Sequence, residues 1–178
     1  MRNVIVTEYQ KDWKEKFRVE AEKIKQIYGD RIIDIHHIGS TSVKDLKAKP
    51  IIDIMPIVRN IEEIDTFNEQ MVTLGYECCG ELGIPGRRYF RKGGDRRTHH
   101  VHMFQVDNYL DINRHLAVRD YLRENEQMRE SYGELKASLA KQHPTNMDAY
   151  INGKDEFVKK LEREALSYVY RRRVTIDD

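Results

Sequence analysis

Apolar residues recur every three or four positions over residues 12–28, which is the spacing of one face of an α-helix. The stripe consists of Trp13, Phe17, Ala21, Ile24 and Tyr28. Asp12 is placed to cap the start of this helix, and Gly29 is placed to end it. The pattern therefore predicts one amphipathic helix near the beginning of the chain.

Two runs rich in β-branched residues follow, over residues 31–38 and 51–58. Such side chains pack well on a pleated sheet, so both runs predict strands. Pro50 stands at the opening of the second run, where a strand tolerates proline. Both faces of the second run are mostly apolar, which indicates a central strand covered on both sides.

The pattern beyond residue 60 predicts a helix, a hairpin and then helices only. Asn60 and Glu63 fit a variant of the capping box, which predicts a helix that reaches Gly75. Further strands are predicted over residues 76–82, 87–92 and 98–106, the last two forming a hairpin around Gly93-Gly94. Helices are predicted over residues 108–124, 126–142 and 155–170. This order predicts a single α+β domain spanning 1–178, with the sheet in 1–106 and packed C-terminal helices in 107–178.

Composition narrows the classes of partner. The chain has 31 Lys and Arg against 30 Asp and Glu, so its net charge of +1 gives no overall attraction to nucleic acid or to a membrane surface. No apolar run approaches the roughly 20 residues of a membrane span. Cys78 and Cys79 are adjacent and cannot form an ordinary loop-closing disulfide. We expect them to be reduced strand residues in a cytoplasmic protein that does not bind membranes.

The first candidate site residues are Gly39, Ser40, Thr41 and Ser42, a small-residue turn between the two predicted strands. Backbone N–H groups and hydroxyls at such a point bind anions, although the turn also fits a simple helix cap. Asp53 lies in the middle of an apolar strand, where a carboxylate has no packing role. It is either part of a functional site or the partner of a structural cation such as Lys47 or Lys49.

Several segments together resemble the GrpB-like family of bacterial proteins: "HHIGSTSV", "AKPIIDI", "HVH", "HLAVRDYLR" and the final Tyr150…Lys154. The resemblance covers nearly the whole chain. It implies a nucleotidyltransferase-like fold, with a small mixed sheet, a Gly-Ser turn after the first core strand and a carboxylate strand after the turn. The chain departs from the usual family pattern at Lys44-Asp45, where Pro-Gly is common, and this departure bears on the shape of the turn.

The carboxylate strand also departs from what the resemblance implies. Nucleotidyltransferases hold two magnesium ions with carboxylates at positions i and i+2, roughly 6.7 Å apart at Cα. Here Met55 takes the second position, and its sulfur does not suit magnesium. In the resembled fold the strand after the hairpin lies beside the aspartate strand, so Asp53, His100 and His102 would converge. They would form a catalytic site for Mg, Mn or Zn, or the histidines would bind a phosphate or Asp53 directly.

Basic residues complete the candidate ligand site. Arg87 and Arg91 alternate on one face of the hairpin and could donate to a phosphate, or they form a charged, solvated sheet edge. The other candidates for ligand binding are Lys49, Arg119 and Lys154. We therefore expect a protein that binds a nucleotide or another small phosphorylated molecule, and that transfers a nucleotidyl or phosphoryl group if it is an enzyme. The alternatives are a non-catalytic binding module and a structural partner domain.

Overall fold

The computed structural model describes residues 3–174, and its contacts divide the chain into two compact units. We call residues 10–38 and 51–111 the sheet unit. We call residues 3–9, 39–50 and 112–174 the helical unit. The expected single domain, divided at residue 106, stays a prediction.

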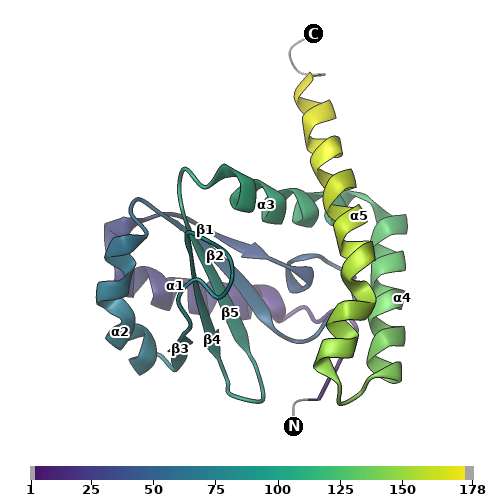
Figure 1. Ribbon diagram of the computed structural model, residues 1–178, viewed down its shortest axis with the longest axis horizontal. Helices are drawn as coiled ribbons and strands as arrows, with labels where there is room; N and C mark the ends of the chain where they lie inside the picture. Colours follow the sequence, from purple (N-terminus) through teal and green to yellow (C-terminus); the bar gives the residue numbers. More distant parts are fainter. Residues whose placement is uncertain (1–2, 175–178) are drawn as a thin grey trace. The chain divides into compact units, whose positions relative to one another are not determined.

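The sheet unit contains a five-stranded mixed sheet in the order β1-β2-β5-β4-β3 (Figure 1). Its strands are β1 (Ile32–Ile38), β2 (Ile52–Val58), β3 (Tyr76–Cys78), β4 (Arg87–Lys92) and β5 (His99–Gln105). Strands β2 and β5 pair in parallel, whereas the other three pairs are antiparallel. The hairpin of β4 and β5 and the central place of β2 are confirmed, while β3 is shorter than predicted.

Helix α1 (Trp13–Tyr28) covers one face of this sheet. It ends at Gly29, which has a φ of 58°, as predicted. The prediction for Asp12 was wrong, because its side chain makes no cap hydrogen bond and instead pairs with Lys16 at 2.8 Å. Glu20 points from α1 toward the sheet and is only 3% exposed.

The segment after β2 is less regular than predicted. A 3₁₀ helix, Glu62–Phe67, precedes a short α2 (Asn68–Thr73). The capping box prediction was wrong, because Oδ1 of Asn60 accepts the N–H of Glu62 at 3.0 Å and the 3₁₀ helix has no side-chain cap. Without a reciprocal cap, the first turns adopt the tighter 3₁₀ geometry.

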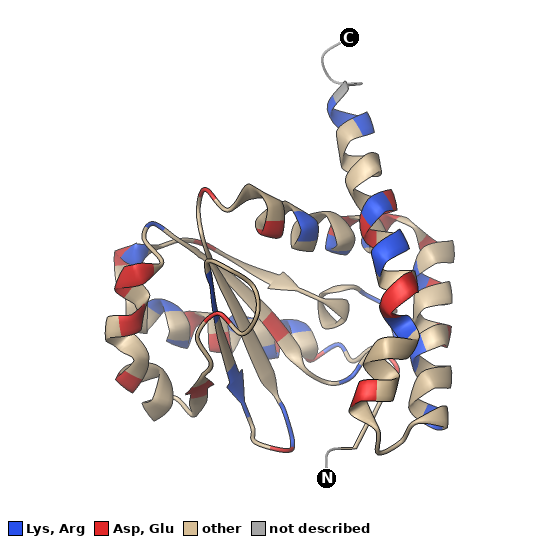
Figure 2. Ribbon diagram, in the orientation of Figure 1, with Lys and Arg blue, Asp and Glu red and all other residues tan. Residues whose placement is uncertain are grey.

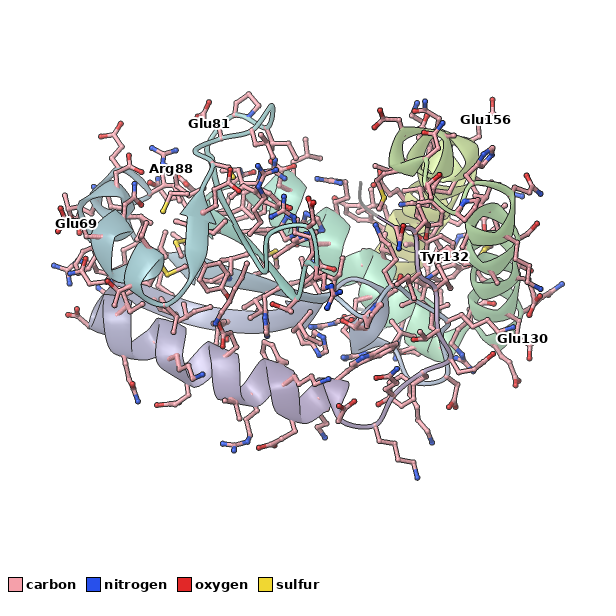
Figure 3. The ribbon with its side chains drawn as sticks, turned by 90° about the horizontal axis from the view of Figure 1, so that it is seen from below. Glu69, Glu81, Arg88, Glu130, Tyr132 and Glu156 are labelled. Carbon is pink, nitrogen blue, oxygen red and sulfur yellow. The ribbon has the colours of Figure 1, made fainter. Side chains whose placement is uncertain are left out.

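The helical unit is built from three helices. They are α3 (Tyr109–Glu124), whose first three residues belong to the sheet unit, α4 (Glu126–Gln142) and α5 (Met147–Val174). Their core contains Leu46, Leu122, Tyr132 and Leu161. Figure 3 labels Tyr132, whose ring stacks on Phe157 at a centroid distance of 5.3 Å.

Helix α5 begins eight residues before the predicted start. Oδ1 of Asn146 accepts the N–H of Ala149 at 3.0 Å and caps the helix. Gly153, which weakens a helix in isolation, lies against Leu139 so closely that an added Cβ would be 2.5 Å from its Cδ2. Close packing therefore accounts for the glycine inside the helix. Among residues 3–174, no helix is long and apolar enough to cross a bilayer.

Candidate functional site

Asp53, His100 and His102 lie together on the adjacent strands β2 and β5 of the sheet unit. The parallel register of β2 and β5 places Asp53 directly beside His100. His102 donates from Nε2 to Asp53 Oδ1 at 3.0 Å, and His100 Nδ1 is 3.5 Å from the same oxygen. The donor atoms of the three side chains all lie within 4.8 Å of one another. Two strands that are neighbours only in space therefore build one cluster.

This cluster lies on the sheet face opposite α1. Lys92 of β4 belongs to the alternate face, where it donates to Glu20 of α1 at 2.7 Å. Tyr89 lies three positions earlier on β4, so its side chain points to the opposite face of the sheet. There its ring contacts both histidine rings, with centroid distances of 5.6 Å to His100 and 5.2 Å to His102. Side chains alternate along a strand, which explains this separation.

The electrostatics of the cluster favour an ionised carboxylate. The side chains are partly exposed, with 24% for Asp53, 16% for His100 and 14% for His102. Burial by itself raises the pKa of Asp53, but its interactions with the two histidines outweigh burial and hold that pKa well below its usual range. Burial, aided by the Asp53 charge, raises the pKa of Tyr89 to about 12. Tyr89 is thus a neutral phenol beside an anionic carboxylate at neutral pH.

The hairpin arginines have partners within the sheet unit. The guanidinium of Arg87 is buried, donates to the carbonyls of Glu81 and Leu82 at 3.1 and 2.8 Å, and lies 4.8 Å from the centre of the Tyr89 ring. Arg91 donates twice to Glu77, at 2.6 Å each. The alternative of a solvated sheet edge was wrong, because β4 lies between β5 and β3 and Arg87 is buried. A role of Arg87 and Arg91 in ligand binding stays a prediction.

A neighbouring arginine on the other face, Arg88, shows the same behaviour. It donates to both carboxylate oxygens of Asp65, at 2.7 and 3.1 Å, and it lies 3.9 Å from Glu81. Figure 3 labels Arg88 and Glu81. Such bidentate pairs orient the guanidinium strongly.

The Gly39–Ser42 turn belongs to the helical unit. Gly39 has a φ of 69°, which glycine adopts without strain, and a 3₁₀ turn, Ser40–Ser42, follows it. Oγ of Ser40 accepts from Nζ of Lys136 at 2.8 Å, and Lys136 is only 3% exposed. Asp45 has a φ of 64°, so it adopts the left-handed conformation that glycine would favour at this position.

The other predicted ligand residues in this unit have aromatic or charged neighbours. Lys49 and Lys154 lie 5.2 and 5.8 Å from the centre of the Tyr150 ring. Arg119 donates to Asp120 at 2.7 Å, and Thr41 is buried. The predicted site residues are therefore divided between the two units, and their roles stay predictions.

Sequence reasoning gave little weight to Lys136 and did not single out Tyr89. Lys136 is 96 residues from Ser40, and its position on an α4 face does not distinguish it from other helix lysines. Tyr89 could have been found, because the hairpin register pairs it directly with His102. Alternation in β4 then puts its ring on the histidine face.

Comparison with known proteins adds to this geometry. A family model described as "GrpB protein" matches residues 3–164. The chain belongs to the GrpB family. A crystal structure of the conserved protein GrpB from Enterococcus faecalis is 51% identical, has a TM-score of 0.91, and covers 93% of this chain and 99% of that one.

A curated relative of the chain is the UPF0157 protein YqkA of Bacillus subtilis. It is 50% identical over 164 residues, which cover 92% of this chain and 48% of YqkA. The chain thus spans about half the length of this relative.

The fold extends beyond the GrpB family. A crystal structure of the Cid1 poly(U) polymerase has a TM-score of 0.54 and 15% identity, and it covers 83% of this chain and 49% of that one. At this identity the likeness concerns the fold alone. It confirms the predicted α+β fold resembling nucleotidyltransferases.

Proposed function

We propose that the chain is a metal-binding, nucleotidyltransferase-like protein whose ligand is a nucleotide or another small phosphorylated molecule. The observation that carries the proposal is the convergence of Asp53, His100 and His102 on the adjacent inner strands β2 and β5. The solved Cid1 structure with the same type of fold is described with magnesium and 3'-dATP bound, which supports the ligand class. The adjacent cysteines favour action in the cytoplasm.

The donor set fits one divalent ion. Zinc binds imidazole nitrogens and carboxylate oxygens at roughly 2.0–2.2 Å, so donors within 4.8 Å of one another need only small side-chain rotations to share an ion. Nε2 of His100 is buried and makes no hydrogen bond within residues 3–174. This ring can therefore turn either nitrogen toward an ion without breaking a bond at Nε2. Two imidazoles and one carboxylate suit zinc, manganese or iron better than magnesium.

The residues of the cluster have distinct roles in this proposal. Asp53 stays ionised and supplies the anionic ligand, while His100 and His102 supply imidazole nitrogens. A bound ion would neutralise phosphate charge and polarise a phosphoryl oxygen. Tyr89 keeps its proton and offers a hydrogen-bond donor beside the histidines. An arrangement of this kind would support transfer of a nucleotidyl or phosphoryl group.

The wild-type chain should bind one Zn²⁺ or Mn²⁺ ion, and Mg²⁺ more weakly by on the order of tenfold or more, because nitrogen ligands disfavour magnesium. Isothermal titration of the metal-free protein with each ion measures this difference. Binding of magnesium as tightly as zinc, or of no ion at all, would contradict the metal proposal.

Met55→Asp is the matching gain-of-ligand variant. Met55 is fully buried, so circular dichroism must first establish that the variant folds. A folded variant should bind magnesium more tightly than the wild type, because the i, i+2 carboxylate pair is then present.

The absence of that second carboxylate in the wild type favours a second candidate function, a non-catalytic module that binds the phosphorylated ligand without turnover.

The Ser40–Lys136 pair supports anion binding in the helical unit. Nζ of Lys136 is within 4.3 Å of the Tyr132 ring centre and donates to Ser40, which fixes a buried positive charge beside the small-residue turn. Lys136→Gln should weaken pyrophosphate binding by roughly tenfold or more, the effect of losing a charged hydrogen bond. Calorimetry measures the change, and Lys141→Gln on the same helix is the control. Equal affinities for both variants would exclude Lys136 from the anion site.

A further inference from the structure

The loop that joins β4 to β5 carries an arginine, Arg97, whose charge is not balanced by a carboxylate. Its one ion pair within residues 3–174 joins its Nη1 to Glu77 Oε2 at 3.9 Å. That same oxygen already accepts from Arg91 Nε at 2.6 Å. Two guanidinium groups thus approach one carboxylate, and one positive charge is left over. Figure 2 shows Lys and Arg on both arms of this hairpin, at the end of β4 and on the loop that leads into β5.

The backbone on either side of Arg97 is fixed. The N–H of Arg96 donates to the carbonyl of Gly93 at 2.9 Å, and the N–H of Thr98 donates to the carbonyl of Lys92, also at 2.9 Å. Gly93 has a φ of 101°, and a Cβ there would lie 2.3 Å from the Arg96 carbonyl oxygen, so this closed turn requires glycine. The turn therefore presents Arg97 from a set position.

The guanidinium of Arg97 lies on the sheet face that carries the Asp53 cluster. Directly paired positions on β3, β4, β5 and β2 form one row of side chains on that face: Glu77, Arg91, His100 and Asp53. Directly paired residues of adjacent strands point to the same side of a sheet. Contact with Glu77 therefore places Arg97 at one end of this row, and the cluster occupies the other end.

Arg97 also has a donor that no protein group uses. Its Nε is buried and makes no hydrogen bond with the described part of the chain, although the side chain as a whole keeps 12% of its surface exposed. A buried N–H without an acceptor is destabilising, so an oxyanion that accepted from it would be favoured. Nε and one Nη of a guanidinium form a fork that matches two oxygens of a phosphate.

The groups around Arg97 do not oppose an anion. Burial raises the pKa of Tyr89 and of Cys79, and the nearby charge of Arg97 acts in the opposite direction on both. Tyr89 keeps its proton at neutral pH, so it can donate to the same anion as Arg97. At the exposed tip of the loop, the charges of Asp95 and Arg96 offset each other.

We propose that Arg97 is the phosphate-binding residue of the sheet unit and holds the phosphate of a ligand beside the Asp53 cluster. Its Nε and one Nη donate to two phosphate oxygens, and the Tyr89 hydroxyl donates to a third. Arg87 and Arg91 differ from it, because they donate to protein carbonyls and to Glu77. The inference rests on the proposed function for the nearby ion, whereas the contact between phosphate and Arg97 does not require the ion.

Calorimetric titration with phenyl phosphate, a phosphate monoester, tests the assignment on the zinc-loaded and on the metal-free protein. Arg97→Gln should weaken binding about tenfold or more, the effect of losing a charged hydrogen bond. Arg97→Lys, which keeps the charge but not the fork, should bind with intermediate affinity. Arg96→Gln removes the same charge from an exposed position in the same loop and should bind like the wild type. Circular dichroism checks folding, which should persist because Glu77 keeps both bonds from Arg91.

Two comparisons separate this inference from the other proposed sites. Arg97→Gln should bind Zn²⁺ as tightly as the wild type, because Arg97 is not a metal ligand. If the wild type binds no zinc but Arg97→Gln still weakens phenyl phosphate binding, the metal proposal fails and the present one is supported. The loss should also be the same in a Lys136→Gln background, because the two residues belong to different units.

Three results would overturn the role of Arg97. Phenyl phosphate does not bind to either form of the wild type, or Arg97→Gln and Arg96→Gln bind it equally well. In the third case, Arg97→Gln loses zinc affinity together with phenyl phosphate affinity, which would mark a structural role instead.

Discussion

Asp53→Asn should lower the affinity of the chain for Zn²⁺ by at least about 100-fold. Losing a residue that only supports a metal ligand already lowers metal affinity roughly 10- to 100-fold, and Asp53 is proposed to be a ligand itself. The amide keeps the size of the carboxylate but removes the only anionic donor of the cluster. Both histidines approach the same carboxylate oxygen, and the amide oxygen that replaces it no longer carries a negative charge to attract them. Competition with a chromogenic zinc chelator measures the loss.

Asp65→Asn is the matched control for this variant. Asp65 is a carboxylate of the same sheet unit whose partner is Arg88, and its loss should leave zinc affinity unchanged. If Asp53→Asn and Asp65→Asn bind zinc equally well, the Asp53 cluster is not the metal site. Retained zinc binding after His100→Ala and His102→Ala together would lead to the same conclusion.

The second large effect concerns stability, at the face of the sheet covered by α1. Glu20 accepts from Lys92 at 2.7 Å and from the Tyr76 hydroxyl at 2.9 Å. Glu20→Gln should lower the free energy of unfolding by roughly 3 kcal/mol, because it leaves the charge of Lys92 without its buried partner. This is the lower end of the usual cost of breaking a buried ion pair, since the Lys92 side chain is still 24% exposed. Urea unfolding followed by circular dichroism measures the difference, with Glu15→Gln on the exposed side of α1 as the control.

The effect of Glu20→Gln should depend on pH. Burial by itself raises the pKa of Glu20, but Lys92, Tyr76 and His99 outweigh burial and lower it. A lowered pKa means that the ionised form stabilises the fold, so the contribution is complete above the unfolded pKa of about 4.3. It is lost as the pH falls through the lower pKa of the folded state. Equal sensitivity of both proteins to acid would contradict this role of Glu20.

The regular part of the fold was predictable because its patterns are local. Runs rich in β-branched residues predicted β1 and β2, the glycine pair Gly93-Gly94 marked the hairpin, and an apolar stripe at helical spacing predicted α1. The early start of α5 was not predictable from propensity, since Asn146 and Gly153 both resemble loop residues. Their helical role depends on a cap bond and on contact with Leu139 across the helix pair.

The candidate site was predictable only in part, for a related reason. The alternation of side chains along a strand predicted that His100 and His102 share one face. The prediction that they lie beside Asp53, in contrast, depended on the resemblance to a known fold. Glu20 resembled a solvated helix residue, because its partner Lys92 is 72 residues away. Long-range partners of single charged residues leave no periodic signal in one sequence.

The parallel pairing of β2 with β5 has a consequence for the lifetime of the cluster. Asp53 and His100 sit on directly paired positions of two adjacent inner strands, so backbone hydrogen bonds rather than a loop set the spacing of their backbones. Innermost strands open to hydrogen exchange mainly when the whole domain unfolds, whereas loops open in local excursions. The backbone positions of Asp53 and His100 should therefore persist on every timescale shorter than global unfolding. A ligand would meet donors whose backbone is already in place, so binding would have only their side-chain rotations left to fix.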